Sequence, residues 1–166
     1  MNLMELKKSL TDNKLKKLYV FTGEEVAIRN IYLKKLSALF KGNTVVTESL
    51  SGITAKLKSN SLIQSSNTLY VIRDDKTVLS AEKIWESLKN GTFQKGNIIV
   101  LIYTSLDKRG KFYKEFTDEI VCFEHLSEDI LLKYIAKEVS ITSDRAKYLK
   151  LRSEERFSRN AETDLV

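Results

Sequence analysis

The chain has 166 residues with a formal net charge of +6, and 42% of its residues are hydrophobic, which is enough to bury a core and excludes a wholly disordered chain. No apolar run approaches the roughly 18 residues of a membrane span, and the mixed, charged start is unlike a signal peptide. The single cysteine excludes an intrachain disulfide, and we therefore expect a cytoplasmic protein. Because no apolar run is long enough to span a membrane, we expect no membrane partner.

Short apolar runs alternate with helical patterns along the chain. Strands are expected at 18–21, 44–47, 69–72, 97–103 and 120–123, and helices at 24–40, 51–63, 80–90, 111–117 and 128–139. This alternation predicts an α/β domain with a mainly parallel sheet. The continuous apolar run at 98–102 indicates a central strand that is buried on both faces.

Several of the expected helix ends carry capping signals. Thr22 and Glu25 fit a capping box at the start of the first helix. Ser80 is expected to cap the third helix and Gly91 to end it. Ser127 is expected to cap the last helix, whose acidic first turn suits the helix dipole.

The first expected strand and helix meet at Gly23, Glu24 and Glu25, where a P-loop protein would carry GxxxxGK[ST]. Here no lysine follows a second glycine, and the turn is too short to wrap a phosphate. A phosphate at a helix N-terminus needs free N–H groups and the positive end of the dipole, but Glu24 and Glu25 place negative charge there. We therefore expect a degenerate P-loop without nucleotide or other cofactor.

Two further sets of polar residues are interpreted as structural. Asp74 and Asp75 follow the third strand as a Walker B acidic pair would, but without a P-loop there is no Mg-nucleotide for them to hold. We interpret them as a solvated strand end or turn. His125 and Cys122 are too few for a metal site, which needs three or four ligands. Strand alternation places Cys122 inside, where a thiol is usually inert. No catalytic residue and no metal site are expected.

The lysines gather in short clusters, at 7–8, 14–17, 34–35, 56–58 and 108–111. Nucleic-acid binding is one interpretation of these clusters, and solvated faces are the other. Aromatic residues of the kind that stack on bases are not interleaved with the lysines, which favours solvated faces.

Leu62 and Ile63 are adjacent large apolar residues within the polar segment 60–67. Two neighbours of this size do not easily face a single helix stripe. One interpretation places one of them in the core; in the other, the pair is an exposed plug for a partner's pocket.

In their order and spacing, four motifs of the chain resemble the DNA polymerase III delta subunit, the clamp-loader subunit that binds and opens the sliding clamp. The first is a short strand that ends in Gly-Glu-Glu, at 18–25, and the second is Ser61-Leu62-Ile63, which precedes Gln-Ser-Ser and a hydrophobic strand. The third is Asp-Lys-Arg-Gly-Lys at 107–111. The fourth, at 121–135, is a strand followed by a helix that contains Tyr134-Ile135. The resemblance covers about residues 15–150. It departs at Ile63, where the family usually has Phe, and this change would weaken clamp affinity.

The resemblance implies an AAA+/RecA-like domain with a mainly parallel sheet and a degenerate P-loop at Gly23, Glu24 and Glu25. It implies no intrinsic catalysis: the chain would be a subunit of a DNA-directed DNA polymerase (nucleotidyltransferase) holoenzyme. Its partners would be the sliding clamp (the beta subunit), the other clamp-loader subunits, which bind ATP, and primed DNA reached through the complex. Leu62 and Ile63, with Ser61, would form the clamp-binding element.

The resemblance also predicts the domain organisation. Residues 1–138 would form the clamp-binding domain, and residues 139–151 would begin a helical lid domain. Residues 152–166 match, in one reading frame, the translation of a widely used sequencing adapter. We therefore expect a non-native tail there, with the natural protein continuing past Leu151 into a lid and a collar.

Two functions of other classes stay open. A P-loop-like NTPase or phosphotransferase would be stabilised by nucleotide, and the missing GK[ST] opposes it. A basic nucleic-acid-binding α/β module would bind DNA without any clamp and with a steep salt dependence.

Overall fold

The computed structural model describes residues 1–41, 43–52, 67–90, 96–124, 130 and 132–133. The chain divides into two compact units, Met1–His125 and Leu126–Val166. The domain boundaries predicted at residues 138 and 151 lie outside the described residues, as does the expected cap Ser127. Within the described part of the chain, no helix is long and apolar enough to cross a membrane.

The first unit alternates helices and strands. In chain order the elements are α1 (Leu3–Thr11), β1 (Leu18–Thr22), α2 (Val26–Leu39), β2 (Thr44–Thr47), β3 (Leu69–Arg73), α4 (Lys76–Ser80), α5 (Glu82–Lys89), β4 (Ile98–Tyr103), α6 (Lys111–Glu115) and β5 (Ile120–Cys122). The five predicted strands are confirmed to within two residues at each end. Of the helix predicted at 51–63, residues 51–52 are helical and the rest lies outside the described residues.

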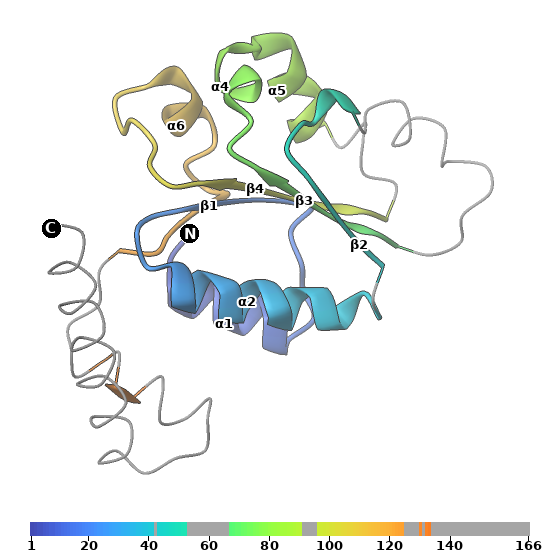
Figure 1. Cartoon of the computed structure of the whole chain (residues 1–166), viewed down its shortest axis with the longest axis vertical. Helices are drawn as coiled ribbons and strands as arrows, with labels where there is room; N and C mark the ends of the chain where they lie inside the picture. The colour runs from blue at the N-terminus through green and yellow to red at the C-terminus, as the bar shows by residue number, and fades with distance from the viewer. Residues whose placement is uncertain (42, 53–66, 91–95, 125–129, 131, 134–166) are drawn as a thin grey trace, which may run out of the picture. The chain divides into compact units, whose positions relative to one another are not determined.

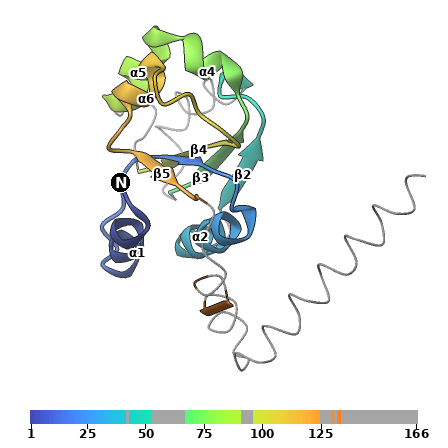
Figure 2. The ribbon, with the colours of Figure 1, turned by 90° about the vertical axis from the view of Figure 1, so that its left-hand side faces the viewer.

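The strands form one sheet in the order β2-β3-β4-β1-β5, and every neighbouring pair is parallel. Helices α1 and α2 cover one face, and α4, α5 and α6 cover the other (Figures 1 and 2). All six residues of β4 are buried, and β4 lies between β3 and β1. The predictions of an α/β fold with a parallel sheet and of a central strand at 98–102 are therefore confirmed.

Aromatic rings fill the layer between the sheet and α2. Tyr19 and Phe21 alternate with Leu18 and Val20 along β1, so their rings share the face that α2 covers. Phe21 and Phe123 meet edge to face with their centroids 5.0 Å apart, and Tyr32 of α2 lies 6.0 Å from Phe123. These contacts join α2 to the ends of two strands.

A second aromatic cluster lies on the opposite face. Trp85 of α5 packs edge to face against Phe112 and Phe116, with centroid separations of 5.7 and 6.1 Å. The Trp85 indole N–H also donates a hydrogen bond of 2.5 Å to the carbonyl oxygen of Val78. Because α4, α5 and α6 share this cluster, they form one layer over the sheet.

The prediction that Ser80 caps the third helix is wrong. Ser80 ends the short helix α4, and α5 begins after Ala81, which provides no side-chain cap. The cap that does form is one helix earlier, where the Asp75 side chain accepts a hydrogen bond from the amide of Thr77. The C-cap of α5 is Asn90, and Gly91 lies outside the described residues.

Candidate functional site at the carboxyl edge of the sheet

The residues expected to form a degenerate P-loop, Gly23, Glu24 and Glu25, lie where β1 passes into α2. Gly23 has a φ of +120°, and a Cβ there would collide with the backbone carbonyl of Phe123. The position therefore requires glycine for two reasons, a positive φ and the close approach of a neighbouring strand end. Glu24 is exposed and Glu25 is half-buried at the N-cap of α2.

Two backbone donors of this turn are used inside the protein. The amide of Gly23 donates to the carbonyl of Thr104 at 3.2 Å, and the amide of Glu25 donates to the carbonyl of Phe123 at 3.1 Å. The amide of Phe123 donates in turn to the carbonyl of Thr22 at 2.7 Å. A phosphate needs such N–H groups free, so the amides of Gly23 and Glu25 are not available to one.

The capping box predicted for Thr22 and Glu25 is wrong. Thr22 is buried as the last residue of β1, and α2 begins at Val26, four residues further on. The strand extends through Thr22 because Thr22 pairs with Tyr103 and Cys122 on its two sides. Glu25 occupies the N-cap position itself, and its side chain makes no capping hydrogen bond.

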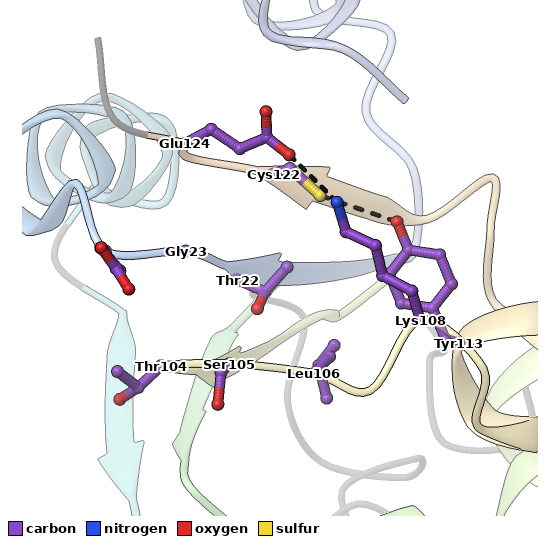
Figure 3. A pocket seen from close by; sticks show the side chains of 10 residues that line it. Thr22, Gly23, Thr104, Ser105, Leu106, Lys108, Tyr113, Cys122 and Glu124 are labelled. Carbon is purple, nitrogen blue, oxygen red and sulfur yellow. Dashed lines mark hydrogen bonds and ion pairs between the residues drawn. The ribbon is translucent and has the colours of Figure 1, made fainter.

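A pocket of about 260 Å³ opens beside the turn (Figure 3). The chain leaves β1 toward one face of the sheet and leaves the adjacent β4 toward the other, so the pocket lies at a topological switch point, where ligands of open α/β sheets bind. Its walls come from the carboxyl ends of three strands and from α6. The lining residues are Thr22, Gly23 and Glu24 at the end of β1, Thr104, Ser105, Leu106 and Lys108 after β4, Cys122 and Glu124 at the end of β5, and Tyr113 of α6.

Two pairs of polar side chains meet in the pocket. The ammonium group of Lys108 forms an ion pair of 3.3 Å with Glu124, and this interaction raises the pKa of Lys108. The Tyr113 hydroxyl lies 3.8 Å from the Cys122 sulfur. Partial burial, together with this contact, raises the pKa of Tyr113. The lining carries two carboxylates, Glu24 and Glu124, against one ammonium group, Lys108, and this charge balance disfavours a polyphosphate.

The acidic residues after β3 differ in their surroundings. Asp74 is exposed, but Asp75 is only 5% exposed, and the interpretation of both as a solvated strand end is wrong for Asp75. The Asp75 carboxylate accepts hydrogen bonds from the amide and hydroxyl of Thr77, at 3.0 and 2.6 Å, and from the amide of Leu50, at 2.7 Å. Burial acts to raise the pKa of Asp75, but these hydrogen bonds together lower it. The Asp75 carboxylate therefore has a structural role, which is to join the chain near Leu50 to the start of α4.

Arg29 is a residue that sequence reasoning does not single out. It is 8% exposed, its Nη1 donates to the carbonyl of Gly23 at 3.3 Å, and its Nε has no hydrogen-bond partner. Burial, and then the nearby charge of Arg73, lower its pKa. The signal that could have found it is its place on the buried stripe of α2, four residues before Leu33 and seven before Leu36. Its hydrogen bond to the Gly23 carbonyl ties α2 to the turn between β1 and α2.

The remaining candidates have different outcomes. Cys122 is half-buried at the pocket rather than enclosed in the core. Ser61, Leu62 and Ile63 lie outside the described residues, as does His125, so their predicted roles stay predictions. Among the described residues, no group of three or more His, Cys, Asp or Glu could hold a metal ion.

No family model and no curated protein matches the chain. Among solved structures, the chain is similar to the DNA clamp loader delta protein of Bacillus subtilis, with a TM-score of 0.63 at 16% sequence identity. The match covers 88% of this chain and 51% of that one, so the chain spans about half the length of its structural neighbour. At this identity the likeness shows the fold alone, which is the AAA+-like α/β fold predicted from the sequence.

Proposed function

We propose that the chain is the clamp-binding, delta-type subunit of a DNA polymerase III clamp loader, and that it acts without catalysis of its own. The observation that supports this proposal best is an AAA+-like fold in which two amides of the turn after β1 are hydrogen-bonded within the protein. The turn donates its amides to Thr104 and Phe123 instead of to a phosphate. The fold is similar to that of a protein titled a clamp loader delta protein.

The surroundings of Asp75 also support a subunit that does not bind Mg-ATP itself. Asp75 occupies the position after β3 where an ATPase would hold magnesium, yet its carboxylate is saturated by Thr77 and Leu50. In the proposed complex, ATP is bound by the other clamp-loader subunits, and primed DNA is reached only through the assembly. This chain supplies binding energy to the clamp.

Leu62 and Ile63, with Ser61, are the proposed clamp-binding element. Each apolar side chain contributes about 1.5–3 kcal/mol if it is fully buried in a pocket of the clamp. A ligand shifts a conformational equilibrium only by its difference in affinity for the two states. Binding at the edge of the clamp therefore opens it only if the open form presents the better pocket.

The test is a titration of the purified chain with the sliding clamp encoded by the same genome, with the melting temperature measured on each variant. Leu62→Ala together with Ile63→Ala should lower the affinity by roughly 30-fold to several thousand-fold and leave the melting temperature unchanged. Ile63→Phe should keep or raise the affinity. A matched control is Met4→Ala with Val26→Ala, two exposed apolar residues of the first unit.

Two results would remove these residues from the proposal: a double variant that binds the clamp normally, or one that unfolds. In the second case the pair belongs to the core, where each change costs about 1–4 kcal/mol. A native chain that does not bind the clamp at all contradicts the proposed function itself.

A further inference from the structure

The pocket at the carboxyl edge of the sheet has no part in the proposed function (Figure 3). Its lining residues all belong to the first unit. An apolar cavity of about 150 Å³ holds a benzene ring, and this pocket has about 260 Å³. It therefore has room for two fused rings, or for one ring with a short side chain.

One wall of the pocket is apolar and continuous with the core. Leu106, Tyr113 and Cys122 line it, and all three also pack against the buried cluster that contains Trp85 and Phe112. All three are half-buried, so each keeps some surface that the core does not cover. Removing this surface from water favours the binding of an apolar or aromatic ring.

Hydroxyl groups lie beside this wall. Thr104 and Ser105 are exposed directly after β4, and both line the pocket. The hydroxyl of Tyr113 lies 3.8 Å from the sulfur of Cys122, and sulfur is a weak hydrogen-bonding group. A hydroxyl both donates and accepts hydrogen bonds. A ligand with N–H groups therefore finds acceptors here without breaking a strong interaction of the protein.

The charged residues of the pocket leave one carboxylate without a counter-charge. Glu124 forms its ion pair with Lys108 at 3.3 Å. Glu24 is exposed at the pocket, and within the described part of the chain it forms no ion pair. A carboxylate beside an apolar wall attracts a ligand with a positive charge and repels one with a negative charge.

The pocket is already formed in the free chain. The amide of Gly23 donates to the carbonyl of Thr104 at 3.2 Å, which joins the ends of β1 and β4. The loop after β4 is closed by a 2.9 Å hydrogen bond from the amide of Arg109 to the carboxylate of Asp107. Walls that are held in this way lose little freedom when a ligand binds, which favours affinity.

We propose that this pocket binds a small aromatic amine, a ligand of one ring or two fused rings that carries a protonated amino group. Leu106, Tyr113 and Cys122 would cover the rings, and the carboxylate of Glu24 would pair with the ammonium group. The inference does not depend on the proposed function, because all the residues that it uses line the pocket and none belongs to the clamp-binding element.

The experiment titrates the full chain by calorimetry with tryptamine, at neutral pH and low salt. Indole-3-acetate is the matched ligand, because it has the same two rings and the opposite charge. Tryptamine should bind with a Kd of about 1 mM or below, as expected for a ligand of about a dozen non-hydrogen atoms. It should bind at least about fivefold more tightly than indole-3-acetate.

The native chain carries its own reporter for the place of binding. Cys122 is the single cysteine of the chain and lines the pocket. Saturating tryptamine should therefore slow the alkylation of Cys122 by N-ethylmaleimide about threefold or more. Indole-3-acetate at the same concentration should slow it less. Heat of binding without any protection of Cys122 would place the ligand elsewhere and overturn the inference.

Two variants separate the contributions of charge and of the apolar wall. Glu24→Gln should weaken tryptamine binding about two- to fivefold and should not weaken indole-3-acetate binding. Leu106→Ala should weaken the binding of both ligands about three- to tenfold. The matched controls are Glu86→Gln, at an exposed carboxylate of α5, and Met4→Ala, at an exposed apolar residue of α1.

The remaining outcomes also decide the inference. It is overturned if tryptamine gives neither heat nor protection at about 5 mM, or if the two ligands bind equally well. It is also overturned if both pocket variants bind tryptamine like their controls, because binding is then non-specific. Should Leu106→Ala unfold, Glu24→Gln and the comparison of the two ligands decide. None of these measurements uses the clamp, so their failure leaves the proposed function standing.

Discussion

The carboxylate of Asp75 accepts a 2.7 Å hydrogen bond from the backbone amide of Leu50, which precedes it by 25 residues. This buried contact fixes the chain after β2 to the end of β3, next to the hydroxyl of Tyr103, which donates to the Asp75 carbonyl. Leu50 is fully buried, so its amide has no access to water as an alternative partner. The contact joins three strand ends at the carboxyl edge of the sheet.

Asp75→Ala is expected to lower the free energy of unfolding by about 2–4 kcal/mol. The change removes the cap of α4 and leaves the buried amide of Leu50 without an acceptor. Urea denaturation measures the effect. Asp74→Asn is the matched control, because Asp74 is exposed with a φ of +52° that asparagine tolerates, and it should stay within about 0.5 kcal/mol of the native chain. Equal effects of the two changes would contradict the anchoring role.

The contribution of Asp75 should also depend on pH. Its pKa is lowered in the folded protein, so its stabilising effect is complete above the ordinary pKa of an aspartate and is lost as the pH falls through the folded value. The difference in unfolding free energy between the native chain and Asp75→Asn should be constant from about pH 5 to 7 and shrink below about pH 4. Thermal unfolding at several pH values checks this, and a difference that grows in acid would refute it.

Gly23→Ala is expected to destabilise the protein by more than about 2 kcal/mol. Part of the cost is a φ of +120° in a residue with a Cβ, and part is the collision with the carbonyl of Phe123. Gly52→Ala provides the contrast, because no atom lies within 4 Å of the added Cβ and Gly52 is helical. That change should be neutral or stabilising by up to about 1 kcal/mol. A tolerated Gly23→Ala would show that the turn can open.

The chain should not bind Mg-ATP. The amides of the β1–α2 turn are donated to strand-end carbonyls, and Glu24 lines the pocket beside them. Calorimetric titration should give no heat of binding above dilution. Micromolar affinity in that titration would overturn both the closed-turn interpretation and the proposal of a non-catalytic subunit.

Local patterns were enough to predict the sheet. The run at 98–102 indicated a buried central strand, and β4 is that strand, because apolar residues on both faces leave no position for it at a sheet edge. The degenerate P-loop stays a prediction, which rests on two local features, Glu24 and the missing lysine. The short helix α1 was overlooked, although Asn2 and Glu5 form a capping box that its sequence contains.

What could not be predicted depends on contacts between distant residues. Asp75 was assigned to a solvated turn because nothing near it in sequence shows that the amide of Leu50 requires an acceptor. Ser80 was favoured as a cap by its residue type, but the Asp75 cap starts a separate helix before it. Thr22 was expected to leave the strand, yet pairing on both sides with Tyr103 and Cys122 keeps it in the sheet.

The place of β1 in the sheet bears on how the chain folds during its synthesis. β1 is made first among the strands, yet it lies between β4 and β5, and its Leu18 pairs with Ile99. The β2–β3 pair can form while the later residues are still being translated, but β1 cannot be enclosed before Val121 has left the ribosome. Its five consecutive buried side chains are exposed throughout that interval. Such non-local parallel pairing folds slowly and favours aggregation, so we expect a chaperone that shields an apolar strand to raise the yield of folded chain.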